Sequence, residues 1–442
     1  SWVEEEIRER EAIAAWDHDE QWPSIQKPPF NIHKAKEFDS RLTVLGEPGQ
    51  LGSGSFGRVD KVIYGSVSLA RKRIERKGRL RNFTMEDLQQ EALTMRKLNH
   101  RHVVKLVGAY MPKPWQFCLL IWPAAVCDLN TLLDNLDWIR EGQDDRNDIM
   151  SRLNVLELND LSAIKPGLNR TMDSAAKCPL DFLRGLLGCI ARAMAYCHLN
   201  GIRHLDIKPT NILLKANRVY LADFGISKDV SGQEQTAIEG EPGTEKWRAP
   251  EHYSKSSSMQ LSDIYSLGLV YLNIAAVLYN IRLAEFDDAL VYPDHLNRSD
   301  KLAVREQKLG SLLQKVASSA SEIPQEITQS QRLVDLITNM ISPTPHTRLP
   351  ANKINERLYI LGGTHQIYYN ECCKRPISWI EDTDEKLATL ASIRAENEDL
   401  KMKITELCNK ETMYEEQLEN TKKAHEQAIT SQKVLFESRE KK

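Results

Sequence analysis

A short run of polar residues between positions 202 and 225 constrains this chain more than any other feature. It reads Ile-Arg-His-Leu-Asp-Ile-Lys-Pro-Thr-Asn over residues 202–211, and Asp-Phe-Gly follows at residues 223–225. Asp206, Lys208 and Asn211 therefore lie close together, with a second carboxylate at Asp223. A base, a cation and two oxygen ligands for a metal are the groups that phosphoryl transfer requires. We expect these side chains to meet in one site.

The length and composition allow two lobes and a tail. The chain has 442 residues, 41% of them hydrophobic, and a formal net charge of -3. That content is enough for a large core with solvated extensions. The balanced charge gives no global attraction to nucleic acid or to an anionic membrane. The longest mainly apolar stretch, residues 267–279, is shorter than a membrane span, so we expect a buried helix there and no span.

The cysteines indicate a reducing compartment. All 8 are scattered along the chain. The adjacent pair Cys372 and Cys373 lacks the spacing and the nearby histidine ligands of a zinc site, so we interpret the cysteines as reduced thiols. The N-terminal residues also lack the cationic start and the apolar run of a signal peptide. We therefore expect an intracellular protein, cytoplasmic or nuclear.

Hydrophobic patterning divides the chain into successive parts. Residues 1–40 are charged and interrupted by prolines, which indicates a peripheral extension rather than core. Short alternating runs in residues 41–121 predict a small sheet carrying one helix, and longer apolar runs in residues 122–361 predict a mainly helical lobe. A polar stretch at about 140–177 interrupts that lobe and is interpreted as a partly mobile insertion. Residues 362–384 are predicted to connect this lobe to the tail.

Residues 51–59 contain the pattern G-x-G-x-x-G. On its own this pattern is weak evidence, because dinucleotide-binding folds share it. Those folds need a helix after the glycines, whereas residues 62–69 have the pattern of a strand, a turn and a second strand. A glycine-rich hairpin lets backbone amides approach phosphate groups. The alternative is an ordinary hairpin with spare glycines.

Lys72 follows on the second of these strands. A helix is predicted from Thr84, and its inward face takes Leu88, Glu91, Ala92, Met95 and Leu98. Because Glu91 is a carboxylate among apolar neighbours, it needs a cationic partner. A pair between Lys72 and Glu91 would meet that need and direct the ammonium group at nucleotide phosphates. The alternative is that Lys72 is one of many solvated lysines.

These motifs occur in the order found in the protein kinase superfamily, which residues 43–361 resemble. The matching set is Gly52, Gly54 and Gly57; Lys72; Glu91; His204, Leu205 and Asp206 with Lys208 and Asn211; Asp223, Phe224 and Gly225; and Ala249, Pro250 and Glu251. A single match is weak, but the ordered set is specific. The resemblance implies an α+β, bilobal protein kinase fold with a small β-rich N-lobe and a larger helical C-lobe. It also implies transfer of the γ-phosphoryl group of ATP to a protein hydroxyl.

The resemblance assigns a role to each matched residue. Asp206 would be the catalytic base, Lys208 would stabilise the transferred phosphoryl group, and Asn211 and Asp223 would bind Mg2+. A lysine two positions after the base is similar to the serine/threonine branch of the family. The ATP site would take the glycines Gly52, Gly54 and Gly57 together with Val59, Ala70, Lys72, Glu91, Trp122, Ala124 and Asp128. For Asp128 the alternative is a cap of the following helix.

Other matched residues would have structural roles, and one residue departs from the family. Asp263 resembles the acid that braces the catalytic loop, and Arg348 resembles the partner of Glu251. Leu205 stands where many kinases have an arginine that binds a phosphate on the activation loop. Leucine cannot make that charge-assisted pair. We therefore expect that phosphorylation between Asp223 and Glu251 is not the usual on-switch.

Residues 385–442 carry a heptad pattern. One seam position takes Leu390, Asn397, Ile404, Glu411 and Leu418, and the other takes Ile393, Leu400, Leu407 and Tyr414. This pattern favours a C-terminal coiled-coil helix. A buried Asn397 would favour two strands and hence a homodimer. A single helix packed on the preceding domain and a disordered charged tail are the alternatives.

Three classes of function account for parts of the sequence. The first is a serine/threonine protein kinase that uses ATP and Mg2+ on a protein substrate, and the second is a pseudokinase scaffold that binds nucleotide or partners and oligomerises through its tail. The third is a structural protein organised by the coiled coil, which leaves the motif set unexplained. The presence of Lys72, Glu91, Asp206, Asn211 and Asp223 favours the enzyme. We expect no specific nucleic-acid partner.

Overall fold

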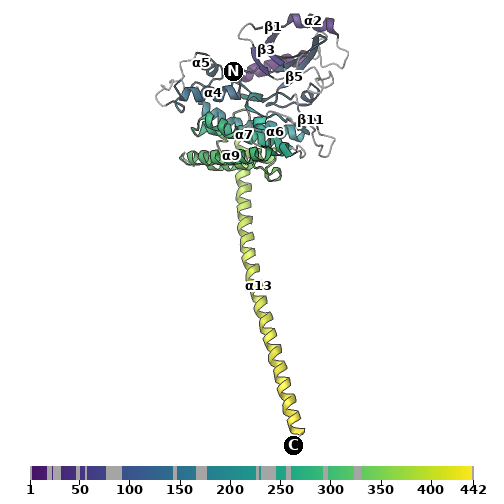
Figure 1. Cartoon of the computed structure of the whole chain (residues 1–442), viewed down its shortest axis with the longest axis vertical. Helices are drawn as coiled ribbons and strands as arrows, with labels where there is room; N and C mark the ends of the chain where they lie inside the picture. The colour runs from purple at the N-terminus through teal and green to yellow at the C-terminus, as the bar shows by residue number, and fades with distance from the viewer. Residues whose placement is uncertain are drawn as a thin grey trace. The chain divides into compact units, whose positions relative to one another are not determined.

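The computed structural model shows a two-lobed domain and a separate long helix. It describes residues 2–16, 22, 31–45, 50–54, 57–75, 92–142, 147–165, 177–224, 228–229, 245–254, 260–291, 297–322 and 330–440. The chain divides into two units, Ser1–Lys374 and Arg375–Lys442. The first unit combines a β-sheet lobe with a helical lobe (Figure 1), which confirms the predicted bilobal α+β fold.

An antiparallel sheet forms the N-lobe. Its strands are β1 (Thr43–Val44), β2 (Gln50–Gly54), β3 (Gly57–Tyr64), β4 (Val67–Glu75), β5 (Lys105–Lys113) and β6 (Gln116–Trp122). The order is β1-β3-β4-β6-β5, with β2 also paired to β3. The glycine-rich run therefore belongs to a hairpin, as predicted, and strand β3 rather than a helix begins at its last glycine. Residues 92–97 are helical and Ala92, Met95 and Leu98 are buried, whereas Leu88 and Glu91 lie outside the described residues.

The N-terminal residues are not peripheral, contrary to the sequence prediction. They form α1 (Trp2–Trp16) and α2 (Ile32–Arg41), and Ile13, Trp22 and Phe38 are buried against the sheet. Their partners include Val62 and Leu69, which lie on the face of the sheet opposite Lys72. Because charged residues and prolines dominate this segment, its sequence pattern did not indicate that a few large apolar side chains cover this outer face.

Helices make up most of the C-lobe. They are α4 (Leu129–Arg140), α5 (Asn147–Val155), α6 (Pro179–Leu199), α7 (Gln260–Leu278), α8 (Leu283–Ala289), α9 (Arg298–Ser321), α11 (Ser330–Met340) and α12 (Ala351–Gly362). The short strands are β7 (Cys127–Asp128), β8 (Ile202–Arg203), β9 (Ile212–Lys215), β10 (Arg218–Leu221) and β11 (Lys228–Asp229). By length and composition α7 could cross a membrane, but 89% of its apolar window is buried within the lobe. It is the buried core helix that the sequence predicted.

Much of the predicted insertion at 140–177 is packed, and this differs from the expectation of a partly mobile segment. The apolar residues Ile149 and Leu153 of α5 are fully buried, and so are Leu156 and Leu158 after it. Ile149 and Leu153 are four positions apart and therefore share one apolar face of α5. The charged residues near the start of the stretch made it look polar as a whole in the sequence.

The domain also continues beyond residue 361. Tyr368 and Tyr369 are buried, and the backbone N–H of Gly188 in α6 donates to the carbonyl of Tyr368 at 2.8 Å. The predicted connector at 362–384 is therefore divided. Its first part packs on α6, and its last residues belong to the next helix.

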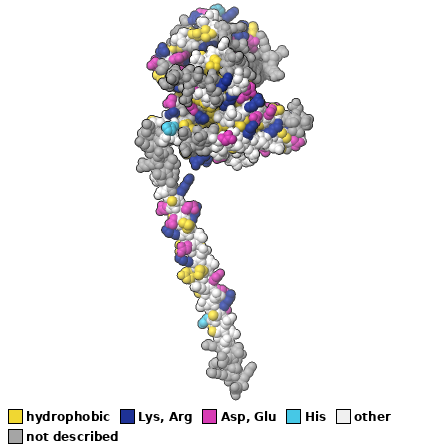
Figure 2. Space-filling view, turned by 90° about the vertical axis from the view of Figure 1, so that its left-hand side faces the viewer, with side chains coloured by type: hydrophobic (Ala, Val, Ile, Leu, Met, Phe, Trp, Pro, Cys, Tyr) yellow, Lys and Arg dark blue, Asp and Glu magenta, His cyan; other side chains and the backbone are white. Residues whose placement is uncertain are grey.

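A single helix, α13 (Ile377–Glu440), has 64 residues and would extend about 96 Å at 1.5 Å per residue. Apolar side chains are exposed along it among charged ones (Figure 2), including Ile393, Leu400, Ile404 and Leu407. These are predicted seam residues of the heptad pattern. Pairs one turn apart, such as Lys403 with Asp399 at 2.7 Å, support the isolated helix.

Candidate active site

The loop from residue 203 to 211 is held by one buried carboxylate. Asp263, in the first turn of α7, accepts hydrogen bonds from the backbone N–H of His204 at 2.9 Å and of Leu205 at 2.8 Å. Its Oδ2 also lies 2.9 Å from Nε2 of His198. Burial alone would raise the pKa of Asp263, but the hydrogen bond from His198 and the neighbouring donors outweigh it and lower the pKa. Asp263 therefore stays ionised and braces the loop, as the sequence predicted.

His204 connects this loop to the strand that leads to Asp223. Its Nε2 lies 2.9 Å from the carbonyl of Ala222, and its Nδ1 lies 3.3 Å from the backbone N–H of Asp206. A carbonyl only accepts and an N–H only donates, so the neutral imidazole with its proton on Nε2 satisfies both. Burial lowers the pKa of His204, which keeps the ring neutral.

Leu205 is held in a left-handed backbone conformation, with φ 67°. Such a conformation costs a branched residue about 1–2 kcal/mol and has to be held by its surroundings. The hydrogen bond from its N–H to Asp263 supplies that restraint. The segment between Asp223 and Glu251, where we expect no usual activating phosphate, includes Ser231, Thr236 and Thr244. These three residues lie outside the described residues.

Asp206, Lys208 and Asn211 form one hydrogen-bonded group. Oδ2 of Asp206 accepts from Nζ of Lys208 at 2.7 Å and from Nδ2 of Asn211 at 3.1 Å. The same Nδ2 donates to the backbone carbonyl of Asp206 at 2.8 Å. Since both bonds use the amide nitrogen of Asn211, the amide oxygen is the atom directed away from Asp206. The proximity predicted from the spacing of these residues is present.

Lys72 and Asp223 bring the two lobes together. Nζ of Lys72 lies 2.8 Å from Oδ1 of Asp223, although the two residues are 151 positions apart. Burial would raise the pKa of Asp223, but the charge and hydrogen bond of Lys72 lower it overall, so the carboxylate is ionised. Glu91, the predicted partner of Lys72, lies outside the described residues, and that pair stays a prediction.

The sheet presents several predicted ATP-site residues on one face. Val59 pairs with Lys72 across β3 and β4, and Ala70 lies two positions before Lys72 on the same face. At Gly57 the φ angle is +143°, and an added Cβ would lie 2.1 Å from the carbonyl oxygen of Arg73. Gly57 pairs with Gly54 across the hairpin, so this turn of the glycine-rich loop requires glycine.

The residues predicted for adenine and ribose contacts have additional structural roles. The side chain of Trp122 is buried on the opposite face of the sheet, where its Nε1 donates to Glu9 at 3.0 Å. Contact with adenine would therefore come from backbone groups near Trp122 and Ala124. Asp128 caps α4 through a 2.8 Å hydrogen bond from the N–H of Thr131, so the capping interpretation is confirmed. Its contact with ribose stays a prediction.

An ion pair buried in the C-lobe fixes the segment after the activation loop. Nη1 and Nη2 of Arg348 donate to the two carboxylate oxygens of Glu251 at 2.7 and 2.9 Å. The hydroxyl of Ser262 donates to Glu251 at 2.7 Å as well. The predicted partnership of Arg348 and Glu251 is therefore present, with a structural role.

One group of reactive side chains was missed by the sequence analysis. His102 and Cys189 lie beside Cys372 and Cys373, so the expectation that this pair has no nearby histidine is wrong. The four residues come from segments far apart in the chain, and His102 is 271 positions from Cys373. No local spacing rule could have joined them. The adjacent cysteine pair was the only signal.

The bilobal fold, the contact of Lys72 with Asp223 and the hydrogen-bonded group of Asp206 and Asn211 are those of a kinase-like domain. The protein kinase domain family matches residues 46–360. This chain belongs to the protein kinase family.

Three relatives that are named as kinases are similar to this chain at low sequence identity. A probable LRR receptor-like serine/threonine-protein kinase of Arabidopsis thaliana is 29% identical over 273 residues, covering 58% of this chain and 24% of the relative. Calcium/calmodulin-regulated receptor-like kinase 2 of the same plant is 24% identical over 389 residues, or 84% of this chain and 75% of the relative. Serine/threonine-protein kinase pakH of Dictyostelium discoideum is 28% identical over 261 residues, or 57% and 42%. The chain thus spans a quarter to three quarters of these relatives.

Proposed function

We propose that this chain is a serine/threonine protein kinase that transfers the γ-phosphoryl group of ATP to a protein hydroxyl. The observation that carries the proposal is the 2.8 Å contact between Lys72 and Asp223. It joins the sheet that would cover the nucleotide to the loop that would hold the metal. Both groups are charged, and the charge of Lys208, which bonds Asp206, also lowers the pKa of Asp223. Phosphoryl transfer needs such an arrangement of charges.

The side chains fit the cofactors that the family uses. Asp223 offers a carboxylate and Asn211 an amide oxygen, which are the hard oxygen ligands that Mg2+ prefers. When bound, Mg2+ neutralises negative charge on the nucleotide phosphates. Lys72 would pair with phosphate oxygens. The glycine hairpin would place backbone N–H groups over them, because Gly54 and Gly57 add no side chain to obstruct the approach.

Asp206 is the proposed catalytic base. Its Oδ2 is occupied by Lys208 and Asn211, which fixes the direction of the carboxylate. The carboxylate would accept the proton of a serine or threonine hydroxyl as the phosphoryl group is transferred. Lys208 would then stabilise the charge on that group. The relatives named as serine/threonine kinases, together with Lys208, support this class of acceptor.

The test is radiolabel transfer from ATP to a generic protein substrate. Asp206→Asn keeps the size of the side chain and an oxygen acceptor, but it removes the base. We expect transfer to fall by a factor of about 10²–10⁴. Unchanged melting temperature would show that the fold is intact. If Asp206→Asn and the wild type give equal signals, the chain acts instead as a pseudokinase scaffold.

We also propose that a second copy of this chain pairs with α13. The heptad residues Ile393, Leu400 and Leu407 are 47–64% exposed on the isolated helix, and pairing two copies would bury them. Removing residues after Asp384 and comparing solution mass tests this. The full chain should have twice its monomer mass and the shortened chain should be a monomer; two monomers would refute the proposal.

A further inference from the structure

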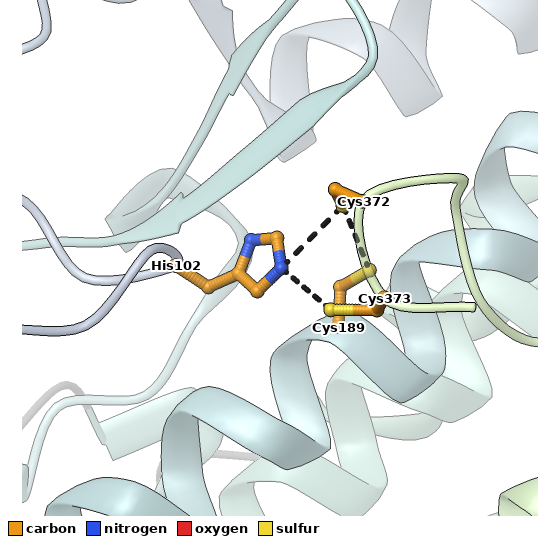
Figure 3. Close-up of side chains that lie close together, drawn as sticks. All are labelled: His102, Cys189, Cys372 and Cys373. Atoms are coloured by element: carbon orange, nitrogen blue, oxygen red, sulfur yellow. Dashed lines mark hydrogen bonds between the residues drawn. The ribbon is translucent and has the colours of Figure 1, made fainter. Parts of the chain in front are cut away.

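Four side chains of metal-ligand type meet outside the proposed ATP and magnesium sites. They are His102 in the loop before β5, Cys189 in α6, and Cys372 and Cys373 after α12 (Figure 3). The imidazole nitrogen and the three sulfurs all lie within 4.8 Å of one another. Three of the residues are buried and Cys372 is half-buried.

The spacing of the ligand atoms matches a tetrahedral metal centre. At usual bond lengths a zinc ion holds two thiolate sulfurs about 3.8 Å apart, and a sulfur and an imidazole nitrogen about 3.6 Å apart. The sulfurs of Cys189 and Cys372 are 3.8 Å apart. Nε2 of His102 lies 3.6 Å from the sulfur of Cys372 and 3.0 Å from that of Cys373. The other pairs of ligand atoms lie within 4.8 Å, so shifts of about 1 Å or less would bring every pair to these spacings.

The imidazole is oriented as a ligand. Nδ1 of His102 lies 2.9 Å from the carbonyl oxygen of Val219 in β10. Because a carbonyl can only accept, Nδ1 carries a proton, and Nε2 is the ring nitrogen that faces the sulfurs and would bind the ion. A hydrogen bond from the second ring nitrogen to a carbonyl is the usual support of a metal-binding histidine.

The cysteine pair is placed by close packing on α6. An added Cβ at Gly185 would lie 2.1 Å from Oδ1 of Asn370, and one at Gly188 would lie 2.3 Å from the ring of Tyr369. These two glycines let residues 368–370 lie directly on the helix. Gly188 immediately precedes Cys189, so this packing delivers Cys372 and Cys373 to it.

Nearby cations would balance the charge of the centre. Three thiolates and one Zn2+ carry a net charge of about -1. The guanidinium of Arg192, one turn after Cys189 on α6, interacts electrostatically with Cys373. Arg101 donates to the backbone carbonyl of Cys372.

We propose that His102, Cys189, Cys372 and Cys373 form a structural zinc site. Binding would form three Zn–S bonds and one Zn–N bond, and the three thiol protons would pass to solvent. Four protein ligands leave no open position for a substrate, and a thiolate-rich set selects zinc over magnesium or calcium. The ion would fasten the loop before β5 and the segment after α12 to α6.

The first test is the metal content of the full chain. The protein is produced with a tag that has neither histidine nor cysteine, and it should contain about one zinc ion per chain by elemental analysis. Replacing zinc by Co2+ should give intense visible ligand-field bands and thiolate charge-transfer bands in the near ultraviolet. Purified protein without zinc and without these cobalt bands would overturn the proposal. So would mass spectra that show a disulfide between Cys189 and Cys372.

A matched pair of variants locates the ion. Cys189→Ala and Cys197→Ala each remove a fully buried thiol from α6, but Cys197 is not in the cluster. We expect Cys189→Ala to lose the zinc and Cys197→Ala to keep it. Cys372→Ser, at a half-buried position, repeats the test should Cys189→Ala not fold. Equal zinc content in Cys372→Ser and the wild type would refute this assignment.

Discussion

Replacing Asp263 with asparagine should damage the fold and the catalytic loop together. The carboxylate meets three donors, the backbone N–H groups of His204 and Leu205 and the ring of His198, at 2.8–2.9 Å. The amide of Asn would keep one acceptor oxygen, which can hold Leu205, but its NH2 group would face the N–H of His204. A buried hydrogen bond to a charged group contributes about 1.5–3 kcal/mol. We therefore expect Asp263→Asn to lose about 2–3 kcal/mol of unfolding free energy, and Asp263→Ala about 3–5 kcal/mol.

Asp263→Asn should also lower the catalytic rate and change how stability depends on pH. The N–H of His204, two positions before Asp206, would lose its acceptor and the loop would shift, so kcat should fall more than the KM for ATP rises. Because the pKa of Asp263 is lowered in the fold, its stabilisation is present above the pKa of an unfolded aspartate and is lost as pH falls below about 4. Urea unfolding at several pH values measures this. The wild type should lose more stability on acidification than Asp263→Asn. The exposed Asp181→Asn is the control, and equal stability of Asp263→Asn and the wild type would refute the reasoning.

Three further substitutions have defined outcomes. Gly57→Ala should lower the free energy of unfolding by at least about 2 kcal/mol and raise the KM for ATP, because its Cβ meets the backbone of Arg73. Gly65→Ala, with open space around it, should lower the free energy of unfolding by only about 1 kcal/mol. Thermal unfolding of the two variants checks this difference. Trp22→Ala should lower the free energy of unfolding, measured in urea, by about 3–5 kcal/mol, because the ring is buried and its Nε1 donates to the carbonyl of Val107 at 2.9 Å. An unchanged free energy would show that the N-terminal segment does not stabilise the sheet. Arg348→Lys should lower the free energy of unfolding by about 2–4 kcal/mol, because a single ammonium cannot reproduce the paired hydrogen bonds to Glu251. An unchanged melting temperature by calorimetry would contradict this.

The catalytic loop could be predicted because its chemistry is local in sequence. Asp206, Lys208 and Asn211 lie within one short loop, and the structure joins them by hydrogen bonds to a single carboxylate oxygen. Asp223 is farther along the chain, but its place followed from the order of the motifs. The contact of Asp223 with Lys72 was not foreseen, because Glu91 was the expected partner of that lysine.

The parts that sequence could not predict depend on contacts between distant segments. Burial of Trp22 depends on the outer face of a sheet formed later in the chain, and nothing in its proline-rich surroundings indicates that face. The ligands around Cys189 meet only because α6, the loop before β5 and the segment after α12 pack together. Hydrophobic periodicity reports which side of one element is buried, but it does not report which other element covers it.

These unpredicted segments act on the same strand, β10, which leads directly to Asp223. Glu6 of α1 forms an ion pair with Arg218 of β10 at 2.7 Å. Glu9 bonds Lys215, at the end of the paired strand β9, at 3.2 Å and Trp122 of the sheet lobe at 3.0 Å. His102 bonds the carbonyl of Val219, also in β10, through its Nδ1. The position of Asp223 relative to Lys72 is therefore supported by residues outside the catalytic motifs. A kinase domain cut to residues 46–360 would lack both α1 and the cysteine pair after α12, so the contacts that support the strand leading to Asp223, the proposed magnesium ligand, would be incomplete.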